Sequence, residues 1–365
     1  MGGEKTVKFS AGIGGRTKAV YATDVEESNP IVNNRERVTW EQGDGVRVFC
    51  EKAEVADKTK AGTNYADYYV MWDGEMNGTN NERSDSMIEA CDGKGFYWGD
   101  AENPYIFYAV SPVAEFSGTG STVAITGTVP AAQSPKRIAA GTKEDGPDFI
   151  AVADLDPEYM VAKTTTNKST SGYVTLQFYP IVTAIQFTLQ NGYPVDSEKS
   201  LSIKSVSLTS KNHAIAGSFT AALGGWTPSG DTYPTCTQVT DGGKTVTLTF
   251  GTAQALANPT AEKNGQSLQL TLFLLPDDSY TSLKAESGQN ERGLNDLTLT
   301  VVKGDGTSLS TDLAYHGKNG NEGVFIPTHK KSYIKGLMVP EGIKLLKITV
   351  NVNERADNGA GSISL

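Results

Sequence analysis

Alternation of apolar and polar residues with a period of two runs through most of this chain, and it predicts a protein built from β-strands. The clearest stretch is residues 173–189, where Pro180 separates two strands because proline cannot donate a backbone hydrogen bond within a sheet. One face of the second strand carries Ile181, Thr183, Ile185, Phe187 and Leu189. We expect this stretch to be the seam between two halves of the molecule.

Similar strands recur roughly every 10 to 20 residues, with turn-forming residues between them. Before the seam they are expected at residues 7–13, 38–50 (two strands and a Gly-Asp-Gly turn), 65–72, 95–98, 104–110, 122–126 and 149–153. After the seam they are expected at residues 202–209, 245–250, 268–275, 297–302, 332–339 and 344–352. Because a helical period is almost absent, the pattern favours antiparallel β-sandwiches.

A chain of 365 residues is too long for one ordinary core, so we expect two domains. The apolar-poor segment 163–172 fits a linker or a long loop, and we expect an N-terminal domain at residues 1–165 and a C-terminal domain at residues 170–365. The strand patterns predict buried side chains at Phe107, Ile185, Phe187, Val206, Leu270, Leu272 and Leu274.

The net charge of −10 argues against binding to nucleic acid or to anionic membranes. No apolar run approaches the roughly 20 residues that a membrane-spanning helix requires. The three cysteines, Cys50, Cys91 and Cys236, are widely spaced, which disfavours zinc and a disulfide framework. We expect them to be small buried side chains, with one disulfide as the alternative. No export signal precedes the first strand, and we expect that one has been removed.

No arrangement of residues predicts catalysis. His213, His316 and His329 are scattered, and neither a zinc-protease nor a serine-hydrolase motif occurs. We therefore expect no catalytic, cofactor-binding or metal-binding site. One group of aromatic residues could stack on sugars, although we favour the alternative that most of its members fill the first core. The group consists of Tyr65, Tyr68, Tyr69, Trp72, Phe96, Tyr97 and Trp98.

A series of short motifs, taken in order, resembles the fimbrillins of Bacteroidales and covers nearly the whole chain. The motifs are Trp40-x-x-Gly43-Asp44 and residues 107–112, 178–180, 185–187, 205–210, 215–219, 273–276 and 331–333. The resemblance implies two tandem transthyretin-like antiparallel β-sandwich domains, export as an outer-membrane lipoprotein precursor, and a place in a fimbria on the cell surface. It also implies assembly by strand exchange, in which a protease removes the first strand after a basic residue and a neighbouring subunit supplies a replacement.

The chain contains segments of the physical kind that this mechanism needs. The alternating strand at residues 7–13 is followed by a glycine-rich stretch with Arg16 and Lys18, the candidate cleavage positions, where accessible backbone suits a trypsin-like protease. The candidate donor strand is residues 344–352, because an added strand gains main-chain hydrogen bonds and fills pockets with alternate side chains. Its apolar face carries Leu346, Ile348, Val350 and Val352. The alternative is that both segments are ordinary terminal strands of their own domains.

A further short match concerns covalent modification. Asp85-Ser86-Met87 resembles the acceptor sequence for O-glycosylation in this bacterial group. We expect this tripeptide in a loop, with Ser86 as the candidate acceptor.

Together these observations predict a non-enzymatic structural subunit of a bacterial surface fimbria, whose partners are other fimbrial subunits joined by strand addition. The alternative is a cell-surface glycan-binding adhesin or lipoprotein of the same fold, which would bind host or microbial surface glycans or proteins through the aromatic residues. A β-sandwich glycosidase has no support beyond fold class, and a fold does not determine a function.

Overall fold

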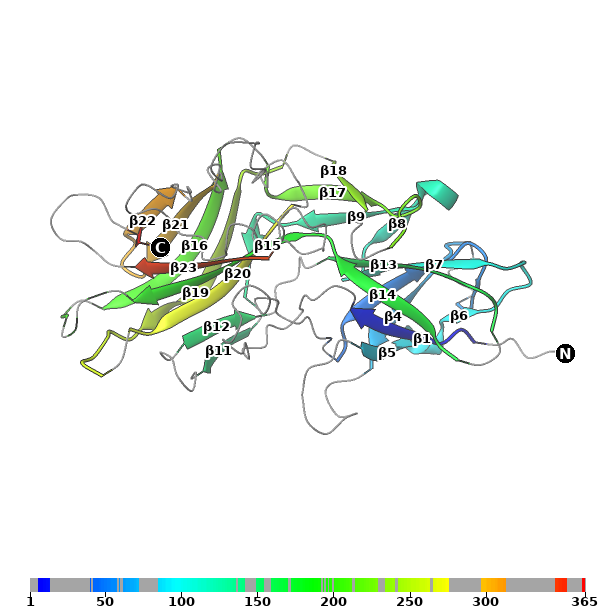
Figure 1. The fold of residues 1–365 in the computed structure, drawn as a ribbon, viewed down its shortest axis with the longest axis horizontal. Helices are drawn as coiled ribbons and strands as arrows, with labels where there is room; N and C mark the ends of the chain where they lie inside the picture. The colour runs from blue at the N-terminus through cyan, green and yellow to red at the C-terminus, as the bar shows by residue number, and fades with distance from the viewer. Residues whose placement is uncertain are drawn as a thin grey trace, which may run out of the picture.

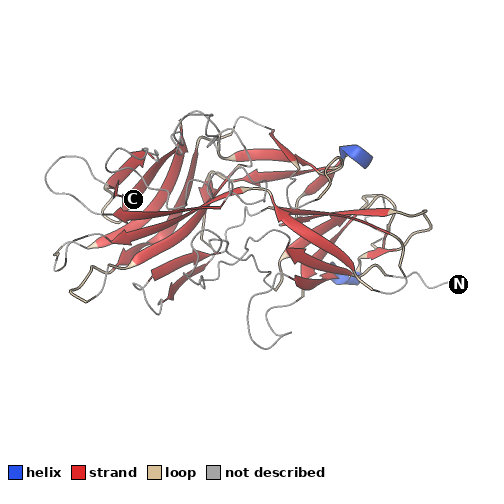
Figure 2. Ribbon diagram, viewed as in Figure 1, coloured by secondary structure: helices blue, strands red, loops and turns tan. Residues whose placement is uncertain are grey.

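The protein is all-β, and its strands form two units that lie side by side along the long axis of the molecule (Figure 1, Figure 2). Helical segments in the described part are single 3-10 turns such as η2 (Cys91–Gly93) and η3 (Gly120–Thr122). The computed structural model describes residues 6–13, 40, 42–57, 59, 62–71, 85–135, 137–141, 149–153, 159–169, 172–191, 193, 195, 197–198, 200–211, 214–228, 234–239, 242–262, 265–275, 297–312, 345–352 and 363–364.

The N-terminal unit is a closed barrel of seven strands. In order around the barrel these are β1 (Phe9–Ile13), β14 (Val174–Pro180), β13 (Met160–Thr166), β7 (Tyr105–Ser111), β2 (Gly45–Phe49), β4 (Tyr65–Val70) and β5 (Asp85–Ala90). Beside the barrel, β3 (Glu54–Val55) pairs with β6 (Phe96–Tyr97). Every second residue of β4 is buried, because successive side chains of a strand point to opposite faces and one face lines the barrel.

The C-terminal unit consists of two larger sheets. The five-stranded sheet has the order β10 (Ala132–Gln133), β19 (Thr245–Leu256), β16 (Leu201–Ser210), β21 (Leu297–Lys303) and β22 (Ser308–Asp312). The six-stranded sheet has the order β11 (Arg137–Gly141), β12 (Phe149–Ala153), β20 (Ser267–Leu274), β15 (Thr183–Asn191), β23 (Leu345–Val352) and β24 (Ile363–Ser364). Nearly every residue of β20 is buried, which agrees with its central place and its almost continuous apolar sequence.

A third sheet joins the two units. Its order is β18 (Thr235–Gln238), β17 (Gly217–Ala222), β9 (Ala124–Val129) and β8 (Glu115–Ser117). β8 and β9 follow β7 of the barrel along the chain, whereas β17 and β18 follow β16 of the C-terminal unit. The pairing of β9 with β17 therefore ties distant parts of the sequence together, and Figure 1 shows the sheet reaching from one unit to the other.

Apolar packing continues from the C-terminal unit, through the third sheet, to the outer wall of the barrel. On that wall the ring of Phe49 stacks on Phe116 of β8 with centroids 5.2 Å apart. Tyr179 of β14 meets Trp226 edge-on at 5.6 Å. Because these rings belong to one continuous cluster of buried side chains, the units share a core at their junction instead of touching only through loops.

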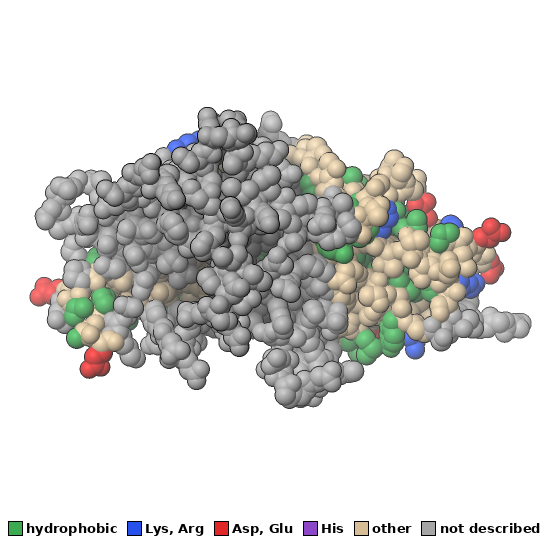
Figure 3. Space-filling view, viewed as in Figure 1, with side chains coloured by type: hydrophobic (Ala, Val, Ile, Leu, Met, Phe, Trp, Pro, Cys, Tyr) green, Lys and Arg blue, Asp and Glu red, His purple; other side chains and the backbone are tan. Residues whose placement is uncertain are grey.

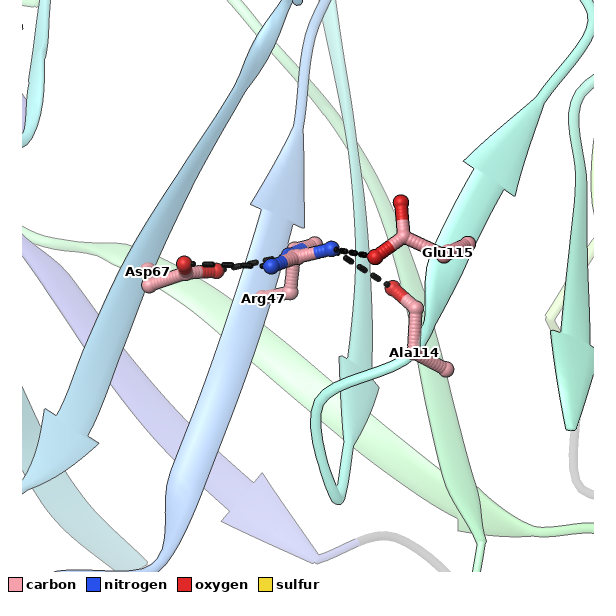
Figure 4. A network of polar contacts seen from close by, with 4 residues as sticks. All are labelled: Arg47, Asp67, Ala114 and Glu115. Atoms are coloured by element: carbon pink, nitrogen blue, oxygen red, sulfur yellow. Dashed lines mark hydrogen bonds and ion pairs between the residues drawn. The ribbon is translucent and has the colours of Figure 1, made fainter. Parts of the chain in front are cut away.

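A buried arginine reinforces the junction near β8. Arg47 of β2 is only 8% exposed, and its Nε lies 2.7 Å from Asp67 Oδ1 of β4. Its Nη1 lies 2.6 Å from Glu115 Oε1 and donates a hydrogen bond to the carbonyl oxygen of Ala114 (Figure 4). The guanidinium also lies over the ring of Tyr65, 4.2 Å from its centroid. A planar guanidinium can serve all these partners at once because its donors form a fixed fork.

A lysine makes a second link between the barrel and the third sheet. Lys163 of β13 donates through Nζ to the carbonyl oxygens of Gly224, at 2.7 Å, and of Trp226, at 2.5 Å. These residues belong to the turn that follows β17. Burial lowers the pKa of Lys163, because a less hydrated ammonium loses its proton more readily.

Most of the predicted core is confirmed. Phe107, Phe187, Val206, Leu270, Leu272 and Leu274 are all buried. Ile185 lies in β15, but its side chain is outside the described residues, as is the strand expected at residues 332–339. The segment expected as a linker or loop, residues 163–172, begins with the last four residues of β13, and β13 and β14 are neighbours in the barrel. The division into two domains at that point stays a prediction, since by strand pairing the barrel continues through β14.

The cysteines only partly follow expectation. Cys50 is buried, as predicted, and burial raises the pKa of its thiol. Cys91 is exposed, so the prediction for it is wrong: it lies in the 3-10 turn after β5, outside the strand pattern that produces burial. Cys236 is half-buried in β18, and no disulfide joins any of the three cysteines.

Replacing Leu272 by Ala should lower the free energy of unfolding by about 2–5 kcal/mol, because it leaves a cavity at a fully buried position of β20. The matched control, Thr249→Ala on an exposed position of β19, should cost less than about 1 kcal/mol. Urea denaturation measures both. Equal losses would contradict the burial of Leu272.

Replacing Arg47 by Met should lower the free energy of unfolding by about 2–3 kcal/mol, because the partly buried carboxylate of Asp67 loses this cation. The side chain of Glu115 is 77% exposed, so Glu115→Gln should cost less than about 1 kcal/mol. Denaturant unfolding of the two variants gives the comparison. A larger loss for Glu115→Gln would show that the stabilising contact is the one to β8.

Candidate strand-exchange site

β1 closes the barrel between two strands that are far from it in sequence. It runs parallel to β14, with Phe9 opposite Val174 and Ile13 opposite Phe178. On its other side it runs antiparallel to β5, with Phe9 opposite Ile88. β1 therefore joins two strands of the barrel that are not paired with one another.

The inward-facing side chains of β1, and that of Val7 two residues before it, are apolar and buried. Val7 is 2% exposed, and Phe9 and Ala11 are 0% exposed. The ring of Phe9 meets Tyr68 and Phe107 edge-on, with centroids 5.2 and 5.0 Å apart. Aromatic pairs in this arrangement are favourable beyond the area that they bury. Without β1, these partners would line an apolar groove.

The outward face of β1 is polar. Lys8 is exposed, and its Nζ lies 5.9 Å from the ring centroid of Tyr173. Ser10 donates through Oγ to Thr175 Oγ1 at 3.3 Å. The backbone N–H of Val174 donates to the carbonyl oxygen of Lys8 at 2.8 Å, so main-chain bonding to β14 begins there. β1 is thus held by backbone pairing and by alternate side chains, as expected of a strand that fills a groove.

The candidate cleavage positions follow directly after β1. Arg16 and Lys18 lie outside the described residues, so their role as processing sites stays a prediction.

The candidate donor strand forms β23 in this structure. β23 runs parallel to β15, with Leu345 opposite Ala184 and Val352 opposite Asn191. On its other side the described pairing is limited to Asn351 and Val352, which pair with β24. The side chains of Leu346, Ile348, Val350 and Val352 are outside the described residues. Their backbone belongs to the C-terminal unit, and their function as a donor strand stays a prediction.

The aromatic group does not form one exposed surface. Tyr68, Phe96 and Trp98 are buried, and Trp98 packs edge-on against Phe107 at 5.8 Å. Tyr65, Tyr69 and Tyr97 are half-buried, and Trp72 is outside the described residues. Tyr69 donates its hydroxyl to Glu89 Oε2 at 2.9 Å, and this bond raises the pKa of Tyr69. The filling of the first core by buried aromatics is therefore confirmed for three of the seven.

The structure places the glycosylation candidate in a strand and not in a loop. Ser86 is the second residue of β5, so the expectation of a loop is wrong. It stands opposite Ala11 of β1 and on the same face of β5 as the buried Ile88. Strand pairing overrides the polar local sequence here, because the pairing partner comes from the distant N-terminus. Glycosylation of Ser86 stays a prediction.

The described surface carries no sign of another chemistry. Within the described residues no three or more His, Cys, Asp or Glu side chains are grouped as metal ligands, and the three histidines lie outside those residues. Among the same residues no helix is long and apolar enough to cross a membrane. Figure 3 shows acidic and basic side chains lying near one another over the barrel unit on the face drawn.

Comparison with known proteins gives one match to a family. A model of the fimbrillin-like family matches residues 32–314. Among solved structures, a candidate cell adhesion protein from Bacteroides uniformis is 14% identical, with a TM-score of 0.44 over 85% of this chain and 88% of that chain. A fimbrial protein from Bacteroides vulgatus is 11% identical, with a TM-score of 0.41 over 98% of this chain and 97% of that chain. No curated protein matches the chain.

Replacing Phe9 by Ala should lower the free energy of unfolding by about 3–5 kcal/mol, because it removes a fully buried ring from the barrel. The neighbouring control Ser10→Ala, on the outward face of the same strand, should cost less than about 1 kcal/mol. Both values come from urea unfolding of the untrimmed protein. Similar small losses for the two variants would mean that β1 is not part of the barrel core.

Proposed function

Because this chain belongs to the fimbrillin-like family, we propose that it is a non-enzymatic structural subunit of a bacterial surface fimbria, assembled by strand exchange. The proposal includes two tandem transthyretin-like domains as the family plan, export as an outer-membrane lipoprotein precursor, and other fimbrial subunits as partners. The membership rests on the family match over residues 32–314, because the structural likenesses have TM-scores below 0.5.

The observation that carries the proposal is the position of β1 in the barrel, between the edges of β14 and β5, which we call the β1 seat. One strand, β1, lies between β14 and β5 and completes a closed barrel, and the side chains of Phe9, Ala11 and the preceding Val7 are buried. Burying a Val or Phe side chain contributes about 1.5–3 kcal/mol, so an empty seat would bind a strand of similar pattern with considerable free energy.

Main-chain hydrogen bonding adds to this apolar term. β1 pairs with β14 on one side and with β5 on the other, so its loss would leave two strand edges with unpaired N–H and C=O groups. An exposed pair of edges flanking an apolar groove is a template for a strand from another chain. The groove and the edges together favour addition of a complete strand over binding of a small ligand.

β23 is suited to supply that strand. Among the described residues it pairs with β15 along its length and with β24 at Asn351 and Val352. A position between β14 and β5 would offer the released strand a line of main-chain hydrogen bonds on each side.

Limited trypsin digestion should cut first within residues 14–18, because glycine-rich backbone fits a protease cleft and paired strands do not. The trimmed protein should then form oligomers slowly, as detected by size-exclusion chromatography with light scattering. Truncation after Gly342 should abolish oligomer formation. Ile348→Asp with Val350→Asp should abolish it too, because a charge in an apolar groove is costly unless it is paired.

The matched control is Thr349→Asp, on the opposite face of the same strand, which should leave oligomer formation intact. Trimmed protein that stays monomeric at high concentration would contradict the proposal. So would equal loss of oligomers with Thr349→Asp, because the effect would then follow charge and not the buried face.

A further inference from the structure

We propose that the outer face of the five-stranded sheet binds an uncharged, extended polysaccharide along one row of hydroxyl side chains. The row crosses the sheet from β19 to β22, and we call it the hydroxyl row. It consists of Thr247, Ser207, Thr300 and Ser310. The inference goes beyond the proposed function and does not depend on strand exchange. It concerns the C-terminal unit, whereas the aromatic group lies in and beside the barrel.

The hydroxyl row follows from the register of the sheet. Ser207 of β16 stands opposite Thr247 of β19 on one side and opposite Thr300 of β21 on the other. Thr300 in turn stands opposite Ser310 of β22. The pairing is regular here, because the irregularity in β16 lies outside the row, at residues 203–205. Four neighbouring strands of the C-terminal unit therefore place hydroxyls in one line across the sheet (Figure 1).

The side chains of the hydroxyl row point away from the core. The residues directly before and after each row position on β16, β19 and β21 are buried, as Val206 and Leu208 are on either side of Ser207. Because successive side chains of a strand point to opposite faces, the row lies on the outer face of the sheet. Ser310 is exposed and the other three residues are half-buried, so solvent reaches the row.

The hydroxyl row and the positions around it carry no charge. The outward positions two residues away on β19, β16 and β21 are five Ser or Thr residues and Val302. The outer wall of the barrel is different, because Lys8 and Glu89 are exposed there. The uncharged surface is therefore not a general property of this acidic chain, and it restricts the class of ligand that the face can bind.

Hydroxyl pairs on this face keep bonding capacity for a ligand. Thr300 Oγ1 and Ser310 Oγ lie 2.8 Å apart, and in the adjacent row Thr209 Oγ1 and Thr245 Oγ1 lie 3.0 Å apart. Each hydroxyl has one donor and two acceptor positions, so a pair that shares one hydrogen bond retains a donor and several acceptors. Sugar hydroxyls both donate and accept, and they can therefore bond to such a pair in either direction. Short side chains also lose less conformational entropy on binding than long ones.

Other classes of partner fit this surface less well. Nucleic acids and anionic membranes are bound through Lys and Arg side chains, and the hydroxyl row contains neither. The centre of a protein interface is enriched in aromatic residues and depleted in Ser, whereas the row and the positions around it are almost entirely Ser and Thr. A ligand made of repeated, uncharged hydroxyl groups matches the surface in both respects.

The spacing of the hydroxyl row suits an extended sugar chain. Neighbouring strands of a sheet lie about 4.7–4.9 Å apart, so the hydroxyl positions recur at that interval across the sheet. The interval is close to the length of one ring in an extended polysaccharide, and a sugar chain lying across the strands would meet one hydroxyl per ring. The row would therefore hold four consecutive rings. Because it contains no aromatic side chain, a single face binds weakly, and a long polysaccharide gains affinity by contacting several copies.

Titration calorimetry of the untrimmed chain with β-1,4-linked manno-, xylo- and gluco-oligosaccharides of two to six rings tests the inference. In at least one series the affinity should rise about 2- to 10-fold per ring up to four rings, because each ring adds one hydrogen bond. From four to six rings the affinity should change little. Thr247→Val combined with Thr300→Val should lower the affinity for the four-ring sugar about 4- to 100-fold, because two hydroxyls are lost while the branched shape is kept.

Two controls separate the hydroxyl groups from the fold. Thr126→Val combined with Thr220→Val makes the same change at paired outward positions of the third sheet and should leave the affinity unchanged. Thr247→Ser combined with Thr300→Ser keeps both hydroxyls and should bind the four-ring sugar like the natural chain. Urea unfolding at the natural midpoint shows that each variant is folded.

The remaining outcomes each overturn the inference. Absence of binding in all three series would show that the face is only solvated, and unchanged affinity in the double valine variant would place the binding elsewhere. Stronger binding of oligogalacturonate, a charged counterpart of the same length, would contradict an uncharged ligand. Dimers in light scattering that the double valine variant abolishes, without sugar binding, would make a second copy the occupant. None of these results bears on strand exchange, which is tested on trimmed protein, so either proposal can fail while the other stands.

Discussion

The structure depends on the closure of a seven-stranded barrel by β1, whose two pairing partners lie far from it in the sequence. Every buried N–H and C=O group needs a partner, so a barrel with one strand missing is not a stable resting state. β1 pairs with β14 and β5 together and places Phe9 among the rings of Tyr68 and Phe107. A position between two strand edges that must be filled is physically suited to accept a replacement strand.

The junction between the units determines how an inserted strand would act on the rest of the molecule. The third sheet pairs β9 with β17, and Arg47 and Lys163 both link the barrel wall to this sheet and its turns. Shared apolar packing, the buried Arg47 and the half-buried Lys163 join the two units more closely than loops alone would.

Periodicity in the sequence was sufficient to predict many of the strands and much of the core, because alternation is a local property. It did not predict β5, β13 or β17, whose sequences are rich in small or polar residues. The pattern around Val206 and Leu272 identifies buried faces directly. It does not say which strand pairs with which, since pairing is decided by distant segments. For that reason β14, although it follows the expected linker, lies in the barrel, and Ser86, although its neighbours are polar, lies in a strand. The sequence predicted the strand at residues 7–13 and the glycine-rich stretch after it, whereas the pairing of that strand with β14 and β5 is evident only from the fold.

The most direct measurement of the central claim is hydrogen exchange, read by mass spectrometry, in β14 and β5 through the three stages of intact, trimmed and assembled protein. The account predicts slow exchange in the intact protein, fast exchange of both strands after removal of β1, and recovered protection once oligomers form, because a new strand then pairs with the same two edges. Protection that is unchanged on trimming would contradict the claim that β1 completes the barrel. Oligomers in which β14 and β5 stay fast to exchange would contradict the claim that assembly fills its seat.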